Sequence, residues 1–273
     1  MNGISAVIPS LGGDLCTTLD SLNSGSIVPN EIIVCLPNDS HSVQNLFRYK
    51  NVSVVYAKRY GQVYQRIIGF KSAKYDYIVQ LDDDILLSFD CLHKLVESFK
   101  VLPENSAIAP TFLIKESNTK PKKIEEMSTF KRILYWVANG KEGFQPGRIS
   151  SSGFHFDLDF SGSTKSINKS EWLMGGCVLH KKNNLILKDY FPFDGKAFSE
   201  DLIHSYLLRE RGIGLYVRND IVAYIDDDLD SVNSLAKLIQ RYKVTNYAAD
   251  LQRRNSIRLK IYYLIKLIRL YLK

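Results

Sequence analysis

Three consecutive carboxylates follow the apolar run at residues 77–81: Asp82, Asp83 and Asp84. In an extended chain alternate side chains point to the same side, so Asp82 and Asp84 can share a divalent cation while Asp83 points away. Such a cation, Mg²⁺ or Mn²⁺, would neutralise a bound diphosphate and stabilise it as it departs. Alternatively, the acids cap a helix near Phe89, but repelling carboxylates at a strand end favour the metal site.

A second acidic pair, Glu200 and Asp201, stands at the start of a segment with helical spacing of apolar residues. Ser199 can cap this helix, and the two acids complement the partial positive charge at a helix amino end. A carboxylate at this point could equally act as a general base toward a hydroxyl group. Both interpretations stay open at the level of the sequence.

The elements that would position these acids alternate along the first 110 residues. Short apolar runs typical of strands occur at 4–8, 31–36, 52–56 and 77–81. Segments with helical spacing occur at 14–23, 41–49, 61–73 and 89–101. This order predicts an α/β fold with a mostly parallel sheet flanked by helices, in which ligands bind beyond the carboxyl ends of the strands.

The regular alternation is lost between residues 111 and 170. Residues 115–123 are polar and contain a Pro, and residues 147–170 are rich in Ser and Gly; both stretches predict loops and a subdomain boundary. Helical spacing resumes after Phe198, a strand is expected at 214–217, and a polar helix is expected at 230–249.

The basic residues are concentrated at the carboxyl end. Residues 251–273 carry seven Lys and Arg and no acid, so 36 − 7 = 29 basic residues balance the 29 acids elsewhere. In a helix one stripe would contain Arg258, Tyr262, Lys266, Arg269 and Lys273. This amphipathic pattern favours contact with an anionic membrane surface. The alternative is a packed helix whose basic stripe is solvated.

Other features of the sequence bear on its compartment. The four cysteines form no CxxC pair, which favours free thiols. The amino terminus lacks an export signal, and no apolar run approaches the ~20 residues of a membrane-spanning helix. We therefore expect a cytoplasmic protein that is peripheral on the inner face of the cell membrane.

Both acidic groups belong to an ordered set of motifs between residues 4 and 225. The other members are residues 7–10, 29–34, Gly61 with Gln65 and Arg66, residues 172–177, and Arg211 with Gly212. Together they resemble the inverting family 2 glycosyltransferases, which have the type A fold that binds a nucleotide diphosphate sugar and carry an Asp-x-Asp (DXD) motif.

On the donor side, the resemblance implies that Pro9 and Ser10 lie against the nucleotide and that Arg66 approaches its base or phosphates. It also implies that Asp82 contacts the ribose or the metal and that Asp84 binds the metal. Pro9 could instead simply end a strand, and Arg66 could be a surface helix residue.

On the acceptor side, the resemblance implies that Asp201 is the catalytic base, with Glu200 beside it. Gly175 and Gly176 would form part of the sugar and acceptor pocket, although the pair could be only a turn. Asp83 is expected among the residues that bind the donor.

Two segments depart from the pattern of the family. It usually shows two acids before Gly-Ser after the second strand, whereas residues 36–40 read Leu-Pro-Asn-Asp-Ser, so Asp39 is expected to read the base. The family often has a late histidine, where this chain has the acids 226–228. These acids could contact metal or phosphate, but capping a helix near Asp230 is favoured.

The resemblance implies a metal-dependent hexosyltransferase. It would move a sugar from a UDP- or dTDP-linked donor to a glycan or lipid-linked acceptor, in the synthesis of a cell-surface polysaccharide or glycolipid. Residues 1–110 would form the nucleotide-sugar-binding half, 111–228 the acceptor-binding and catalytic half, and 229–273 a helical tail.

Two other classes of function fit less well. A nucleotidyltransferase would need a basic glycine-rich loop, but residues 9–14 contain glycines without Lys or Arg. A nucleic-acid-binding protein could use the basic tail, but the neutral body offers no extended phosphate groove. We therefore expect no nucleic acid partner.

Overall fold

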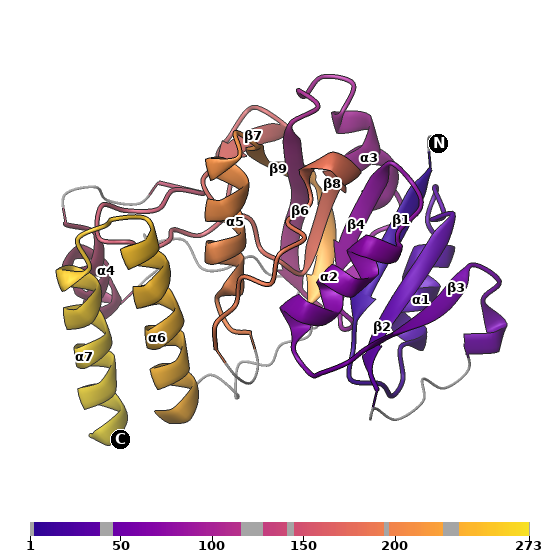
Figure 1. Ribbon diagram of the computed structural model, residues 1–273. Coiled ribbons are helices and arrows are strands. Elements are labelled where there is room, and N and C mark those ends of the chain that lie inside the picture. The colour runs from indigo at the N-terminus through magenta and orange to yellow at the C-terminus, as the bar shows by residue number, and fades with distance from the viewer. Residues whose placement is uncertain are drawn as a thin grey trace.

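The computed structural model describes residues 3–38, 46–115, 128–140, 145–193, 197–225 and 235–272. In this part of the chain a nine-stranded sheet has the order β3-β2-β1-β4-β8-β6-β9-β5, with β7 paired to β9. Helices flank the sheet (Figure 1). The predicted α/β class is confirmed, and the four cysteines are free thiols, as expected.

The amino-terminal half follows the predicted alternation. Its parallel strands are β1 (Ile4–Pro9), β2 (Glu31–Pro37), β3 (Val52–Ala57) and β4 (Tyr77–Leu81). Its helices are α1 (Cys16–Asn23), α2 (Gln62–Ser72) and α3 (Cys91–Ser98). All six residues of β1 are buried, as expected for a strand in a sheet covered on both faces. Of the helix predicted at 41–49, residues 41–45 lie outside the described residues and Leu46–Arg48 form the 3₁₀ turn η1.

The second half contains more regular structure than expected. The interval 111–170 contains the end of β6 (Ser106–Ile114), together with α4 (Thr129–Asn139) and β7 (Ile167–Ser170). The loop predicted at 147–170 is confirmed as far as residue 166, and β7 was missed because it is short and polar and depends on antiparallel pairing with a distant strand, β9. Of the loop predicted at 115–123, residues 116–123 lie outside the described residues. The boundary drawn at residue 110 falls inside β6, at a register shift between Pro110 and Thr111.

The remaining strands join the two halves into one sheet. They are β5 (Leu86–Leu87), β8 (Cys177–Lys181) and β9 (Gly214–Ile225). Strand β8 runs antiparallel between β4 and β6, while β6 and β9 are parallel. The strand expected at 214–217 is therefore present and longer than predicted.

Three helices form the carboxyl-terminal part of the fold: α5 (Glu200–Glu210), α6 (Leu235–Leu251) and α7 (Ile257–Tyr271). Figure 1 shows α4, α6 and α7 together at one end of the molecule, with α5 between them and the sheet. Buried Leu134, Ala138 and Tyr262 hold α4 against α7. Among the described residues, no helix combines the length and apolarity needed to span a bilayer.

The basic stripe of the tail lies differently from the prediction. Arg258 donates to the carbonyl oxygens of Trp136 and Val137 on α4, and Arg269 lies over the ring of Phe130 on the same helix. The stripe turns toward α4 because that amphipathic helix, which the sequence analysis missed, packs against α7. The other side of α7 has exposed apolar residues, namely Ile257, Ile261, Leu264 and Ile268.

Candidate active site

The site begins where β1 and β4 end beside each other. The hydroxyl of Ser10, just after β1, donates to the carboxylate of Asp83, just after β4, at 2.6 Å. The backbone N–H of Asp82 donates to the carbonyl oxygen of Gly176 at 2.9 Å, which ties the end of β4 to the turn before β8. Parallel pairing thus brings Pro9 and Ser10 to the acidic triad, as the βαβ order predicted.

The three acids do not alternate as in an extended strand. Strand β4 ends at Leu81, residues 83 and 84 form a turn, and all three acids line one cavity. The expectation that Asp83 points away was wrong because the chain has left the strand before Asp83. The acids do not cap α3 either, since β5 intervenes and Asp90 is the residue before α3.

This cavity, which we call the sheet-edge cavity, has a volume of about 730 Å³. Its walls come from residues 9–11, from residues 59–65 at the start of α2, from the triad, and from Asp189, Phe191, Phe193 and Ala197. Gly61 precedes α2 with a φ of 136°, a conformation that a side chain would strain. The amino end of α2 therefore forms part of a wall that also carries the carboxylates.

Arg66 links the triad to the start of α5. Its side chain is 2% exposed, and its guanidinium contacts Glu200 at 2.5 Å and Asp82 at 3.1 Å. Gln62 donates to Asp82 at 3.0 Å, and the hydroxyl of Tyr190 donates to Glu200 at 2.7 Å. Arg66 is therefore no surface residue: it is a buried cation whose charge is balanced by two acids that are distant in sequence.

Asp82 is held in an unusual electrostatic environment. Burial raises the pKa of its carboxyl to about 6; Arg66 opposes this shift, while the charges of Glu200 and Asp84 add to it. A carboxylate in this environment gains from a cation that approaches from the cavity. Proximity to Asp84 thus creates a local excess of negative charge at the cavity wall.

The residues at the sheet edge fit a divalent cation whose coordination shell a bound ligand would complete. Carboxylate oxygens are the hard donors that Mg²⁺ and Mn²⁺ prefer. Among the described residues, no group of three or more His, Cys, Asp or Glu is arranged to hold a metal by itself. Mg²⁺ is usually bound by one or two carboxylates together with phosphate oxygens and water, so a pair of acids such as Asp82 and Asp84 matches that pattern.

Helix α5 begins with a strained residue. Ser199 has a φ of 59°, and its side chain makes no capping hydrogen bond, so the predicted Ser199 cap is not formed. A non-glycine residue in this left-handed conformation costs about 1–3 kcal/mol and is found where the surrounding structure fixes it. Glu200 and Asp201 do lie in the first turn, as predicted. The strain thus falls immediately before the two acids.

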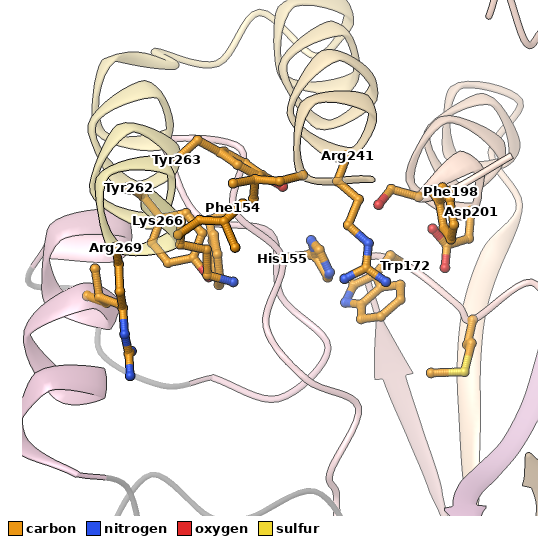
Figure 2. A pocket seen from close by; sticks show the side chains of 15 residues that line it. Phe154, His155, Trp172, Phe198, Asp201, Arg241, Tyr262, Tyr263, Lys266 and Arg269 are labelled. Carbon is orange, nitrogen blue, oxygen red and sulfur yellow. The ribbon is translucent and has the colours of Figure 1, made fainter. Parts of the chain in front are cut away.

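Glu200 and Asp201 point in different directions from the first turn of α5. Glu200 contacts Arg66, whereas Asp201 lines a second cavity of about 600 Å³, which we call the helical cavity. Figure 2 shows Asp201 at one end of this cavity and Arg241 reaching from α6 toward His155 and Trp172. Adjacent residues on a helix are about 100° apart, which explains why one turn can serve two cavities.

Asp201 has the properties of a proton acceptor. Burial raises the pKa of its carboxyl to about 7, and the neighbouring charge of Glu200 adds to this effect. The N–H of Leu202 donates to one of its oxygens at 3.0 Å and fixes the side chain. A base whose pKa lies near the working pH accepts a proton efficiently while a substantial fraction of it is ionised.

Comparison with known proteins gives the family. The sequence pattern described as glycosyl transferase family 2 matches residues 5–161, more than half of the chain. The chain belongs to this family. No curated protein sequence matches it.

Solved structures resemble this family 2 glycosyltransferase in fold. GalNAc-T7 with UDP, GalNAc and Mn²⁺ matches with a TM-score of 0.57 and 17% identity over 82% of this chain and 43% of that one. Residues 1–349 of S. aureus TarS in complex with UDP-GlcNAc match with a TM-score of 0.54 and 15% identity, over 91% of this chain and 66% of that one. The chain thus spans less than two thirds of the length of these proteins, and at such identities the likeness concerns the fold.

The glycine pair lies against the start of α5 and the end of β4. A Cβ on Gly175 would lie 3.0 Å from a carboxylate oxygen of Glu200 and 3.6 Å from Cβ of Asp201. Gln80 donates to the carbonyl oxygen of Gly175 at 2.5 Å. The pair is more than a turn, because the start of α5 packs so closely that a side chain at Gly175 would press on Glu200.

Two residues of the site were missed by the sequence analysis, and other predicted residues lie outside the described residues. Gln62 could have been found, because it stands four residues before Arg66 on α2 and shares its face. Tyr190 lies in an irregular segment without a periodic signal. Asp39 and the acids 226–228 lie outside the described residues.

Proposed function

We propose that the protein transfers a hexosyl group from a UDP- or dTDP-linked sugar to an acceptor hydroxyl, with inversion at the anomeric carbon. The observation that carries this proposal is the position of the first turn of α5, which contributes Glu200 to one cavity's charge network and Asp201 to the other cavity. In a single displacement the nucleophile and the leaving group lie on opposite sides of the reacting carbon. Two cavities separated by one helical turn suit that requirement.

The sheet-edge cavity would bind the donor. Pro9 and Ser10 would contact the nucleotide, and Arg66 would hold Asp82 in place rather than contact the phosphates directly, because it is buried behind the acid. Bound Mg²⁺ or Mn²⁺ would supply Lewis-acid stabilisation of the departing diphosphate. Asp82 and Asp84 would hold that cation, and Asp83 would keep Ser10 in position.

The helical cavity would bind the acceptor. Asp201 would take the proton from the acceptor hydroxyl as its oxygen attacks the anomeric carbon and the bond to the diphosphate breaks. The pKa of about 7 suits this role, because the carboxylate form is available and strongly basic for an aspartate. Glu200 would act through its contact with Arg66 rather than as the base.

Binding of nucleotide sugars tests the donor assignment. The protein would be screened with UDP- and dTDP-linked sugars, with and without Mn²⁺, and its melting temperature recorded. A donor present at about 100 times its Kd stabilises the fold by about 2.7 kcal/mol. We expect stabilisation that requires both nucleotide and cation. Unchanged melting with every nucleotide would contradict the proposed donor site.

We also infer that the enzyme works at the inner face of the cell membrane, where it would serve the synthesis of a polysaccharide or glycolipid. The exposed fractions of the apolar residues on α7 support this: 44% for Ile261, 55% for Leu264 and 50% for Ile268. The neighbouring helix α4 exposes Ile133 by 53% and Trp136 by 59%. Burial of such apolar side chains in a lipid interface is favourable.

Vesicle sedimentation tests this location. Deletion of α7 would uncover the buried residues that hold α4, so substitution is the cleaner change. Leu264→Gln with Ile268→Gln should reduce binding to vesicles that contain anionic lipid, whereas Val101→Gln, at a residue 76% exposed elsewhere, is the matched control. Equal sedimentation of both variants and the parent would exclude α7 as the contact.

A further inference from the structure

Three cations line the helical cavity: Arg241 from α6 and Lys266 and Arg269 from α7. Figure 2 shows Asp201 at one end of this cavity, Arg241 and Lys266 along it, and Arg269 at the other end. Asp201 is the one acid among the described residues of the lining, and within the described chain no ion pair joins the three cations to an acid. The cavity therefore has an excess of positive charge.

Aromatic rings hold the cations in place without neutralising them. The guanidinium of Arg241 lies 5.4 Å from the ring centre of Phe198, and the ammonium of Lys266 lies 4.9 Å from that of Tyr262. A cation over a ring face is attracted by the ring but keeps its full charge and its hydrogen-bond donors. The charges are thus oriented while their donors are left for another partner.

The clustering of these cations is unfavourable without a counter-charge. The pKa of Lys266 is lowered, first by partial desolvation and then by the charges of Arg241 and Arg269. Burial, followed by Arg241 and Lys266, also lowers the pKa of His155 to about 4, so this residue is neutral at physiological pH. Like charges held together in a partly desolvated space repel one another, and a bound anion would relieve that repulsion.

We propose that the helical cavity binds an acceptor that carries a phosphate group, with Arg241, Lys266 and Arg269 around the phosphate and the reacting hydroxyl at Asp201. This inference rests on the proposed function and names the chemical class of its acceptor. Arginine forks match phosphate oxygens in two parallel hydrogen bonds, and lysine adds a point charge. Phe154 and Trp172 also line the cavity, and aromatic rings suit contact with a sugar or an apolar chain.

The phosphate is a handle for binding and does not react. The bond that forms joins the acceptor oxygen to the anomeric carbon, the bond that breaks joins that carbon to the donor diphosphate, and the proton goes to Asp201. A phosphate could belong to a lipid-linked acceptor or to a phosphorylated glycan. Both sources share the same anionic chemistry, so the experiment includes a probe for each.

Tryptophan fluorescence provides a local measurement of binding. The chain has two tryptophans, and in a Trp136→Phe background Trp172 in the cavity wall is the single reporter. The probes are decyl phosphate below its micelle concentration and glucose 1-phosphate, with decanol and glucose as their neutral counterparts. We expect the phosphates to bind and the neutral molecules to bind at least about tenfold more weakly, since hydrogen bonds to charged groups contribute about 1.5–3 kcal/mol.

Matched variants then assign the binding to the three cations. Arg241→Gln and Lys266→Gln should each weaken phosphate binding about tenfold or more. Lys243→Gln on α6 and Lys260→Gln on α7 remove exposed charges outside the lining and should leave it within about twofold of the parent, because surface charges act weakly at this range. Lys266→Gln should keep or raise the melting temperature, because it relieves repulsion; a fall would indicate a structural role and overturn the proposal.

The remaining outcomes separate this proposal from the proposed function. UDP binding with Mn²⁺ is measured on the same variants and should be unchanged by Arg241→Gln. Loss of UDP binding in that variant would mean that the cations serve the donor, which overturns the proposal. Phosphate binding that depends on Arg241 in a protein that binds no nucleotide would support the anion site while contradicting the transferase. Equal weakening by all four substitutions would reduce the effect to general charge and also overturn it.

Discussion

The two cavities on either side of the first turn of α5 differ in how their charges are balanced. In the sheet-edge cavity the buried cation Arg66 is paired with Asp82 and Glu200. In the helical cavity Arg241 and Lys266 rest on aromatic rings, with no ion pair in the described chain. Charges balanced within the protein keep a fixed geometry, whereas unbalanced charges require an anion from a ligand. Under the proposed function, the contrast separates a donor side whose buried cation is already paired from an acceptor side whose cations a ligand would pair.

The largest expected effect comes from a change of Asp201, the proposed base that would take the proton from the acceptor hydroxyl. Asp201→Asn keeps the size of the side chain, but its amide cannot accept the proton. Turnover, measured as release of nucleoside diphosphate, should fall by the ~10² to 10⁴ typical of a lost general base, while donor binding persists. Full turnover in Asp201→Asn would place the base elsewhere.

The second prediction concerns the stability that the paired charges beside the sheet-edge cavity provide. Arg66→Met leaves Glu200 buried without its cation, and such a change typically costs about 3–5 kcal/mol of unfolding free energy. Arg59→Met is the control: Arg59 also pairs with an acid, Asp189, but its side chain is 60% exposed, so the expected loss is about 0–1 kcal/mol. Chemical denaturation measures both. Equal losses would mean that the buried network is not what stabilises this region.

The sequence predicted the sheet-edge cavity, where the cation is paired with acids, better than the helical cavity, where the cations are not. Strands β1 to β4 were found because their apolar runs are local signals, and the acids at 82–84 were placed correctly at the end of β4. The partners of Arg66 could not be predicted, since Glu200 is 134 residues away in the chain. The helical cavity was not predicted, because helix α4 was not predicted. The packing of α4 against α7 turns the basic stripe toward the cavity, whereas the sequence analysis expected it to contact lipid.

The third prediction tests the cation on the donor side. Asp84→Asn should remove most of the Mn²⁺-dependent gain in nucleotide affinity, by about tenfold or more, because changes in and around a metal's ligands have effects of that order. Asp83→Asn should be milder, because Asp83 already accepts the hydroxyl of Ser10 at 2.6 Å. Calorimetric titration with UDP, with and without Mn²⁺, measures both. A metal response that survives in Asp84→Asn but not in Asp83→Asn would reverse the two roles.

The last prediction concerns pH and the coupling between the two sides. The active form of Asp201 is the carboxylate, so the rate of nucleoside diphosphate release at saturating donor should rise with pH through about 7, where its pKa lies. Well below that midpoint the rate should fall about tenfold per pH unit, because the ionised fraction falls in that proportion.

Glu200 gives this prediction its control, because its negative charge is the second cause of the raised pKa of Asp201, after burial. In Glu200→Gln that negative charge is gone, and less of the positive charge of Arg66 is neutralised. Both changes favour the ionised form of Asp201. The midpoint of the pH profile should therefore move to lower pH, even though the maximal rate falls as the network around Arg66 loosens. A midpoint that stays in place or moves upward would show that the two acids act independently, and that the first turn of α5 does not couple the cavities.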